Sequence, residues 1–249
     1  MHHFFVNMDQ IDELNNEIHI IGDDRNHIQN VLRIKANEEI SISNGVDSKE
    51  YRCEIKELLP DEILLTIRFI KESNVELPSK IYLFQGLPKS DKMELIIQKT
   101  CELGIYEIIP VEMKRCIVKL DKKKMESKIK RWQTIATTAA KQSQRNIIPE
   151  VKEVVTFKQA IEMVKELDVK LLPYELASDM QATRDIFTKI EKGQSIAIFI
   201  GPEGGFSEEE IEIAKSENIT PITLGKRILR TETAGIATLA MLMYEIEGR

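Results

Sequence analysis

Two short stretches of this 249-residue chain combine residue types that bind ligands and act on them. The first, IGPEGGFSEEE at 200–210, places three glycines directly after the apolar run 196–200. The second, LGKRILRTETAG at 224–235, brings three cations into five residues: Lys226, Arg227 and Arg230. Glycine lets a ligand approach the main chain closely, and clustered cations stabilise negative charge. Together the two stretches predict a ligand pocket with a charged edge.

The glycine-rich stretch does not have the chemistry of a phosphate-binding loop. It fits neither GxxxxGK[ST] nor GxGxxG. Pro202 has no N–H to offer an anion, and the Glu203 carboxylate would repel one. Gly204 and Gly205 permit positive φ angles, so the loop suits the edge of an adenine or a ribose. The alternative is a tight strand-to-helix turn with no ligand, ended by a capping box from Ser207 to Glu210.

The elements around these loops alternate between strand and helix patterns. The predicted strands are 81–86, 106–111, 169–173, 196–201 and 221–224. The predicted helices are 91–103, 121–143, 158–167, 183–191, 207–217 and 232–247. Such alternation predicts an α/β fold with a mainly parallel sheet covered on both faces. Both loops then follow carboxyl ends of strands, which is where ligands of these sheets bind.

The N-terminal part of the chain has a different pattern of predicted secondary structure. Its predicted strands are Glu17–Ile21, Glu39–Ser43, Tyr51–Leu58 and Ile63–Ile70, with a helical pattern at 27–33. Short strands at this interval indicate a small barrel or sandwich. The polar stretch 71–79 serves as a linker, so we expect one domain at 1–72 and a second at 73–249.

The amino-acid composition excludes several classes of protein. The three cysteines are widely spaced, which indicates neither a disulfide framework nor a zinc site and favours a reducing cytoplasm. All four histidines lie within the first 27 residues, so we expect no histidine triad and no metal centre in the α/β domain. No apolar run reaches the length of a membrane span. We therefore expect a cytoplasmic protein that holds no metal and spans no membrane.

The formal net charge of −6 is unevenly distributed along the chain. Residues 114–145 contain eleven Lys and Arg against two Asp and Glu, and every other part of the chain is acidic. A polyanion would be attracted to that segment rather than to the whole surface. The alternative is a solvated helix face with no partner.

These motifs resemble those of a known protein family. FIGPEGGFSEEE (199–210) followed by LGKRILRTETAGIATL (224–239) is similar to the ribosomal RNA small subunit methyltransferase E family of the SPOUT superfamily. The stretches at 85–111, 131–145 and 27–35 resemble further elements of that family in the same order. The resemblance implies a PUA-like β-barrel followed by an α/β domain with a deep trefoil knot. It also implies a homodimer.

The resemblance further implies methylation of N3 of a uridine in 16S rRNA, with S-adenosyl-L-methionine as the cofactor and the small ribosomal subunit as the partner. Alternatives are a SPOUT methyltransferase acting on tRNA, or a non-catalytic RNA-binding assembly factor. Arg230 would stabilise negative charge on the uracil ring, with a salt bridge or a helix-start contact as its alternative role. Glu232 would orient Arg230 or accept the proton, or would only be a charge at a helix start.

Binding residues follow from the same resemblance. The implied cofactor-binding residues are Leu172, Pro173, Ile200, Gly201, Pro202, Glu203, Gly204, Gly205, Thr223, Leu224, Gly225, Ile228, Leu229, Arg230, Thr233 and Ala234. The implied RNA-binding residues are His27, Arg33, Lys123, Lys124, Arg131, Gln142, Ser143 and Arg145.

Overall fold

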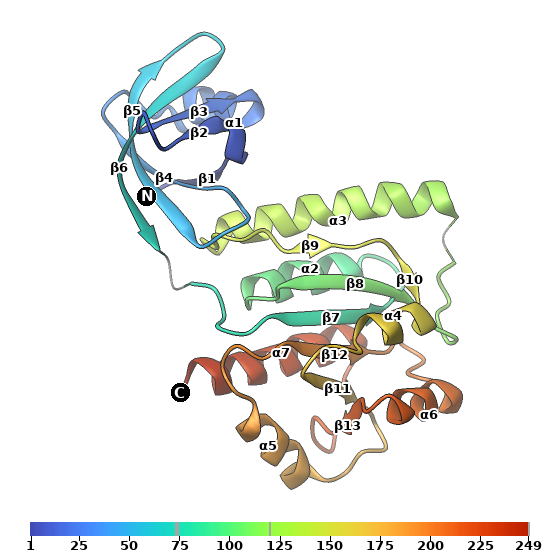
Figure 1. The fold of residues 1–249 in the computed structure, drawn as a ribbon. Helices are drawn as coiled ribbons and strands as arrows, with labels where there is room; N and C mark the ends of the chain where they lie inside the picture. Colours follow the sequence, from blue (N-terminus) through green and yellow to red (C-terminus); the bar gives the residue numbers. More distant parts are fainter. Residues whose placement is uncertain (73–74, 120, 249) are drawn as a thin grey trace. The chain divides into compact units, whose positions relative to one another are not determined.

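The computed structural model describes residues 1–72, 75–119 and 121–248. They form two compact units (Figure 1). One unit comprises Met1–Glu76 and Ala140–Ile148, and the other comprises Leu77–Ala139 and Pro149–Arg249. The expected boundary after residue 72 falls against residues 73 and 74, which belong to the expected linker 71–79 and lie outside the described residues.

The N-terminal unit contains a six-stranded sheet in the order β1-β4-β5-β6-β3-β2. Its strands are β1 (His3–Phe5), β2 (Ile11–Asp12), β3 (Glu17–Ile21), β4 (Glu39–Ser43), β5 (Lys49–Leu58) and β6 (Glu62–Glu72). The four predicted strands are confirmed as β3 to β6, and the helical pattern at 27–33 is confirmed as η2 (His27–Leu32). The sequence pattern did not predict β1, β2, η1 (Met8–Gln10) or α1 (Gly22–Asn26).

Alternating side chains give this sheet one buried face. Ile18 and Ile20 of β3, and Ile63 and Leu65 of β6, are fully buried in one apolar cluster. Register shifts interrupt the pairing of β5 with β6 between Arg52 and Cys53 and between Ile55 and Glu57. Bulges of this kind increase local twist, which lets a small sheet curve around its own core.

The C-terminal unit is built on a parallel sheet in the order β10-β8-β7-β12-β11-β13, with β9 paired to β8. Its strands are β7 (Ile81–Gly86), β8 (Glu107–Glu112), β9 (Glu150–Val151), β10 (Val155–Thr156), β11 (Val169–Pro173), β12 (Ile196–Ile200) and β13 (Thr220–Ile222). The predicted parallel α/β arrangement is confirmed. The two-residue strands β9 and β10 were missed.

Six helices accompany the parallel sheet. They are α2 (Lys92–Glu102), α3 (Lys122–Gln142), α4 (Phe157–Met163), α5 (Met180–Lys189), α6 (Glu208–Ser216) and α7 (Thr231–Glu247). All six predicted helices are present, with ends that differ by up to four residues. The structure assigns the last turn of α3 to the N-terminal unit, since the division falls between Ala139 and Ala140.

The buried strand β12 shows how the sheet acquires two covered faces. Ile196, Ile198 and Ile200 belong to the core cluster that includes side chains from α2, α3, α5 and α7. Ala197 and Phe199 belong to the opposite cluster, which includes side chains from α4 and α6. Successive side chains of a strand point to opposite faces, so an uninterrupted apolar run is what a strand covered on both sides requires.

Candidate functional site

A pocket of about 490 Å³ lies at the carboxyl ends of β11, β12 and β13 in the C-terminal unit. Both loops singled out in the sequence line it, although they are separated by helix α6 along the chain. The lining residues are Lys92, Pro173, Tyr174, Glu175, Ile200, Gly201, Pro202, Glu203, Gly204, Gly205, Phe206, Thr223, Leu224, Gly225, Lys226, Arg227, Ile228, Leu229, Arg230, Thr231 and Ala234.

The glycine-rich loop (201–207) has a fixed shape. The N–H of Gly205 donates to the carbonyl of Pro202 at 2.9 Å, and Gly205 has a φ of 66°. Glycine adopts this left-handed conformation without a steric cost. The predicted capping box is confirmed, because the Ser207 side chain accepts from the Glu210 N–H and the Glu210 side chain accepts from the Ser207 N–H. The loop therefore leads into α6 at a defined point.

Basic residues hold the glycine-rich loop from outside the pocket. Arg115 donates to the carbonyl of Gly204 at 2.9 Å. The main-chain N–H of Lys114 donates to Glu210 at 2.8 Å, and its side chain forms an ion pair with Glu209 at 2.8 Å. The segment that follows β8 thus fixes the loop that follows β12.

The second loop (223–230) is joined to the first at the start of α7. The Thr231 hydroxyl donates to the carbonyl of Gly201 at 2.6 Å and accepts from the buried Gln85 side chain at 2.9 Å. The Thr223 hydroxyl accepts from the Gly225 N–H at 3.2 Å. These bonds keep the two loops together as the walls of one pocket.

Part of the second loop has unused main-chain donors. Within the described part of the chain, the N–H groups of residues 226–229 make no hydrogen bond to protein. Main-chain N–H groups that are not bonded within the protein can donate to a ligand. They are available to the nitrogens and hydroxyls of a ligand that enters the pocket.

Charged side chains meet at the edge of the pocket. Lys92 lies 2.8 Å from Glu203 and 3.4 Å from Glu232. The ion pair with Glu203 raises the pKa of Lys92. Partial burial opposes ionisation of Glu203, but hydrogen bonds from Lys92 and from the main chain outweigh it and lower the pKa of Glu203. Arg230 lines the pocket, is exposed to solvent and stands immediately before α7.

The structure places most of the expected cofactor residues in this pocket. Two expected cofactor residues lie outside the lining: Leu172 is fully buried in the core, and Thr233 is exposed on α7. Glu232, expected as a catalytic residue, lies beside Lys92 and is not part of the lining either. The lining also includes residues that sequence reasoning did not assign: Lys92, Tyr174, Glu175, Phe206, Lys226, Arg227 and Thr231. Lys226, Arg227 and Thr231 lie within the second motif, LGKRILRTETAG, so that motif could have indicated them as pocket residues.

The expected RNA-binding residues divide between the two units. Lys123, Lys124 and Arg131 lie on α3 in the C-terminal unit and are exposed. Arg131 forms an ion pair with Glu94 at 2.8 Å, and Lys124 forms one with Asp121 at 3.2 Å. Part of the positive charge seen in the sequence is thus neutralised by nearby carboxylates.

The remaining expected RNA-binding residues belong to the N-terminal unit. His27, Arg33 and Gln142 are exposed, and Ser143 is half-buried. Arg145 differs from the expectation of a surface phosphate ligand: it is 4% exposed and forms an ion pair with Glu76 at 2.5 Å. Two main-chain N–H groups, of Asn146 and Ile147, also donate to Glu76. In this structure the guanidinium fixes segment 140–148 within its unit.

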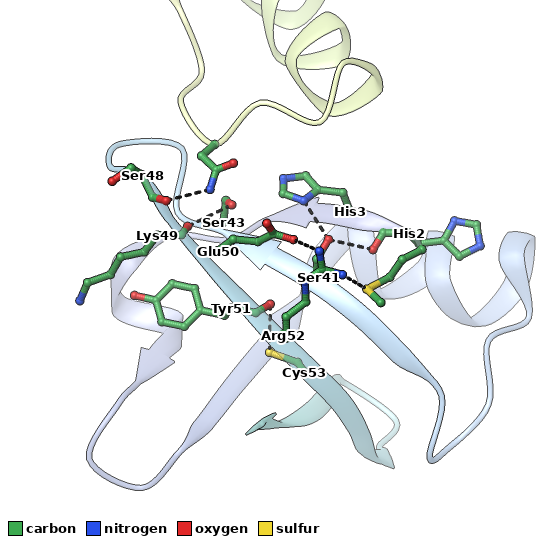
Figure 2. Close-up of polar contacts among 12 residues, drawn as sticks. His2, His3, Ser41, Ser43, Ser48, Lys49, Glu50, Tyr51, Arg52 and Cys53 are labelled. Carbon is green, nitrogen blue, oxygen red and sulfur yellow. Dashed lines mark hydrogen bonds and ion pairs between the residues drawn. The ribbon is translucent and has the colours of Figure 1, made fainter. Parts of the chain in front are cut away.

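Polar side chains on β4 and β5 form a separate cluster in the N-terminal unit (Figure 2). His3 lies 3.0 Å from the Ser41 hydroxyl, and Arg52 forms an ion pair with Glu50 at 2.8 Å. Burial lowers the pKa of His3, against the opposing charge of Glu50. The cluster links β1 to β4 through side chains.

No helix within 1–72, 75–119 and 121–248 has the length and apolar character needed to cross a membrane. The same described ranges contain no group of three or more His, Cys, Asp and Glu side chains placed to bind a metal ion.

Comparison with known proteins defines the family. Residues 75–243 match the model of the RNA methyltransferase domain, and residues 20–68 match that of the RNA methyltransferase PUA domain. Ribosomal RNA small subunit methyltransferase E of Bacillus subtilis (strain 168) is 39% identical over 231 residues, which are 92% of this chain and 90% of that protein. The chain belongs to the ribosomal RNA small subunit methyltransferase E family. The PUA-like domain followed by an α/β methyltransferase domain is thereby confirmed, and the deep knot stays a prediction.

Solved structures of similar proteins agree with this assignment. A ribosomal RNA small subunit methyltransferase E from Neisseria gonorrhoeae, bound to S-adenosyl methionine, is 30% identical with a TM-score of 0.83 and covers 98% of this chain and 97% of its own. A putative methyltransferase from Legionella pneumophila, in complex with the bound cofactor SAM, is 33% identical with a TM-score of 0.83 and covers 96% of each chain. This family member therefore shares its fold with cofactor-bound methyltransferases.

Proposed function

We propose that this protein transfers the methyl group of S-adenosyl-L-methionine to N3 of a uridine in 16S rRNA. The observation that carries the proposal is the single pocket formed by loops 201–207 and 223–230 at the carboxyl edge of the sheet. These loops contain the motifs by which the chain resembles its family.

The pocket fits the proposed cofactor. Its volume of about 490 Å³ lies in the range of sites for small organic cofactors. Ile200, Leu224 and Ala234 offer apolar surface to the adenine ring, and residues 226–229 offer free main-chain donors. Glu203 and Glu175 supply negative charge for a ligand with a sulfonium and an ammonium group. We propose that the expected cofactor-binding residues that line this pocket hold the cofactor, while Leu172 and Thr233 act from behind the lining.

The proposed chemistry is a direct displacement. When bound, S-adenosyl-L-methionine supplies a methyl group on a positively charged sulfur. The bond from N3 to that carbon forms as the sulfur–carbon bond breaks, and N3 loses its proton. Arg230 stabilises the negative charge that spreads to O2 and O4 of the uracil, as preorganised donors do at developing anions. Glu232 accepts the proton or orients the charges beside it.

We propose that RNA binds to cations of both units. Lys123, Lys124 and Arg131 would contact phosphates from the C-terminal unit, and His27 and Arg33 from the N-terminal unit. Gln142 and Ser143 would add polar contacts. Arg145 would support segment 140–148 from within. We also propose that residues 1–72 form an RNA-binding domain and that residues 73–249 form a methyltransferase domain.

The proposed partners are the small ribosomal subunit and a second copy of the chain, and the proposed location is the cytoplasm, where ribosomal RNA is modified. Two exposed apolar side chains of the C-terminal unit are candidates for the dimer contact: Tyr244 on α7 is 76% exposed and Ile228 in the second loop is 84% exposed.

Methyl transfer in vitro tests this proposal. Purified protein is incubated with labelled S-adenosyl-L-methionine and with small ribosomal subunits, free 16S rRNA or tRNA, and the nucleosides are then separated. We expect label in 3-methyluridine from 16S rRNA. Label in tRNA alone would support a tRNA methyltransferase, and cofactor binding without any transfer would support an assembly factor.

A further inference from the structure

Lys92 connects three segments that are far apart in the sequence. It is the first residue of α2, and its ammonium group lies 2.8 Å from a carboxylate oxygen of Glu203 in the glycine-rich loop. The same ammonium group lies 3.4 Å from Glu232, in the first turn of α7. Lys92 also lines the pocket. One side chain thus connects the glycine-rich loop with the start of α7.

The two carboxylates depend on Lys92 to different degrees. The Glu203 oxygen also accepts a main-chain hydrogen bond from Lys89 at 3.1 Å. The Glu232 oxygen that faces Lys92 is buried and has no hydrogen-bond partner among the described residues, so the nearby ammonium charge is its main compensation. A buried carboxylate without a compensating charge is strongly unfavourable. Removing Lys92 would release both carboxylates and let them repel each other.

We propose that Lys92 is a positioning residue that sets the affinity for S-adenosyl-L-methionine by holding the glycine-rich loop and the start of α7 at a fixed separation. This inference rests on the proposed function. The ammonium group acts through Glu203 and Glu232 and not on the transferred methyl group. Its loss therefore affects cofactor binding through Glu203, and through Glu232 it also affects the step in which N3 loses its proton.

The test compares Lys92→Met and Lys92→Arg with the wild-type protein. Calorimetry gives the dissociation constant for S-adenosyl-L-methionine, and methyl transfer gives KM and kcat. We expect Lys92→Met to raise the dissociation constant and KM about tenfold, because the glycine-rich loop loses its ion pair with α2, and to lower kcat as well, because Glu232 loses its partner. Lys92→Arg should restore most of the affinity, since it keeps a cation with several donors.

Lys99→Met is the matched control. Lys99 lies on the same helix and pairs with Glu102 at 2.8 Å, away from the pocket lining. We expect its cofactor affinity to be unchanged. If Lys92→Met does not fold, Lys92→Gln removes the same positive charge with a polar side chain and is measured in the same way.

The outcomes separate this inference from the proposed function. A purely structural role would lower the melting temperature and the active fraction while KM stays constant, and that result would overturn the inference. Wild-type protein that binds S-adenosyl-L-methionine but methylates no 16S rRNA would overturn the proposed function, while calorimetry would still test Lys92.

Discussion

Arg230 occupies the position best suited to act on the uracil ring. It lines the pocket, is exposed, and has a main chain fixed by the start of α7. We expect Arg230→Ala to lower kcat about 100-fold, as loss of one donor to a developing anion does in other enzymes. Calorimetry should show a dissociation constant for S-adenosyl-L-methionine within about threefold of wild type, since adenine packing remains.

Arg227→Ala is the control for this substitution, because Arg227 lies in the same loop, is exposed and lines the same pocket. We expect a smaller loss of turnover than for Arg230→Ala. Full turnover by Arg230→Ala at unchanged cofactor affinity would show that the catalytic assignment is wrong.

Gly86, the last residue of β7, allows Pro202 of the cofactor loop to approach this strand closely. A Cβ atom at this position would lie 2.7 Å from both the ring and the main-chain nitrogen of Pro202. A proline ring cannot rotate away, so the loop must move. We expect Gly86→Ala to weaken binding of S-adenosyl-L-methionine at least tenfold and to destabilise the fold by about 1–3 kcal/mol, as measured by calorimetry and urea unfolding.

Gly235→Ala provides the comparison. A Cβ atom there meets its nearest neighbours at 3.6 Å, which is ordinary contact, and the residue lies within α7. Alanine favours a helix over glycine, so we expect no loss of stability. Equal effects of the two substitutions would contradict the proposed contact with Pro202.

The predictability of the site differs from residue to residue. Glu203 and Gly205 belong to a contiguous motif, so the sequence alone indicated their role. Lys92 lies 111 residues from Glu203 along the chain, and only the tertiary fold brings the two together. Arg145 looked like a phosphate ligand because its buried partner Glu76 is 69 residues away. Ion pairs between residues so far apart in the sequence produce no local sequence pattern.

At the scale of elements, the ion pair between Arg145 and Glu76 ties segment 140–148 into the N-terminal unit. Both side chains are largely buried. Among the described ion pairs, one more involves segment 140–148: Lys141 with Asp24 at 2.9 Å. We expect Arg145→Met to destabilise the protein by about 3–5 kcal/mol, because it leaves a buried carboxylate without its cation. Urea unfolding measures this loss.

Lys56→Met is the matched control within the same unit. Its ion pair with Glu17 is similar in length, at 2.7 Å, but the Lys56 side chain is 52% exposed. Exposed pairs contribute about 0–1 kcal/mol, so the loss should be small. Equal destabilisation by both substitutions would contradict a special role for the buried pair.

Elements with a strong internal pattern were predictable. The run at 196–200 is apolar at every position and became β12 with two covered faces. Strands β9 and β10 contain two residues each, too few for any periodicity. Their pairing with β8 depends on the position of that strand in the folded sheet. The position of such short strands therefore depends on the topology of the sheet and not on a local sequence pattern.

At the scale of the whole molecule, the proposed homodimer makes a distinct prediction. Tyr244 lies on α7 and is 76% exposed, so a charge there would oppose burial against a second copy. We expect Tyr244→Arg to be monomeric in light scattering after gel filtration, with reduced methyl transfer. Leu14→Arg, at a 95% exposed position of the N-terminal unit, should leave the oligomeric state unchanged. A Tyr244→Arg protein that remains dimeric would exclude this face of α7.

The most direct test of the proposed function is the content of 3-methyluridine in 16S rRNA, measured by mass spectrometry in a strain that lacks this protein. We expect the modification to be absent at one position, restored by the wild-type gene and poorly restored by Arg230→Ala. An unchanged 3-methyluridine content in the deletion strain would contradict the account.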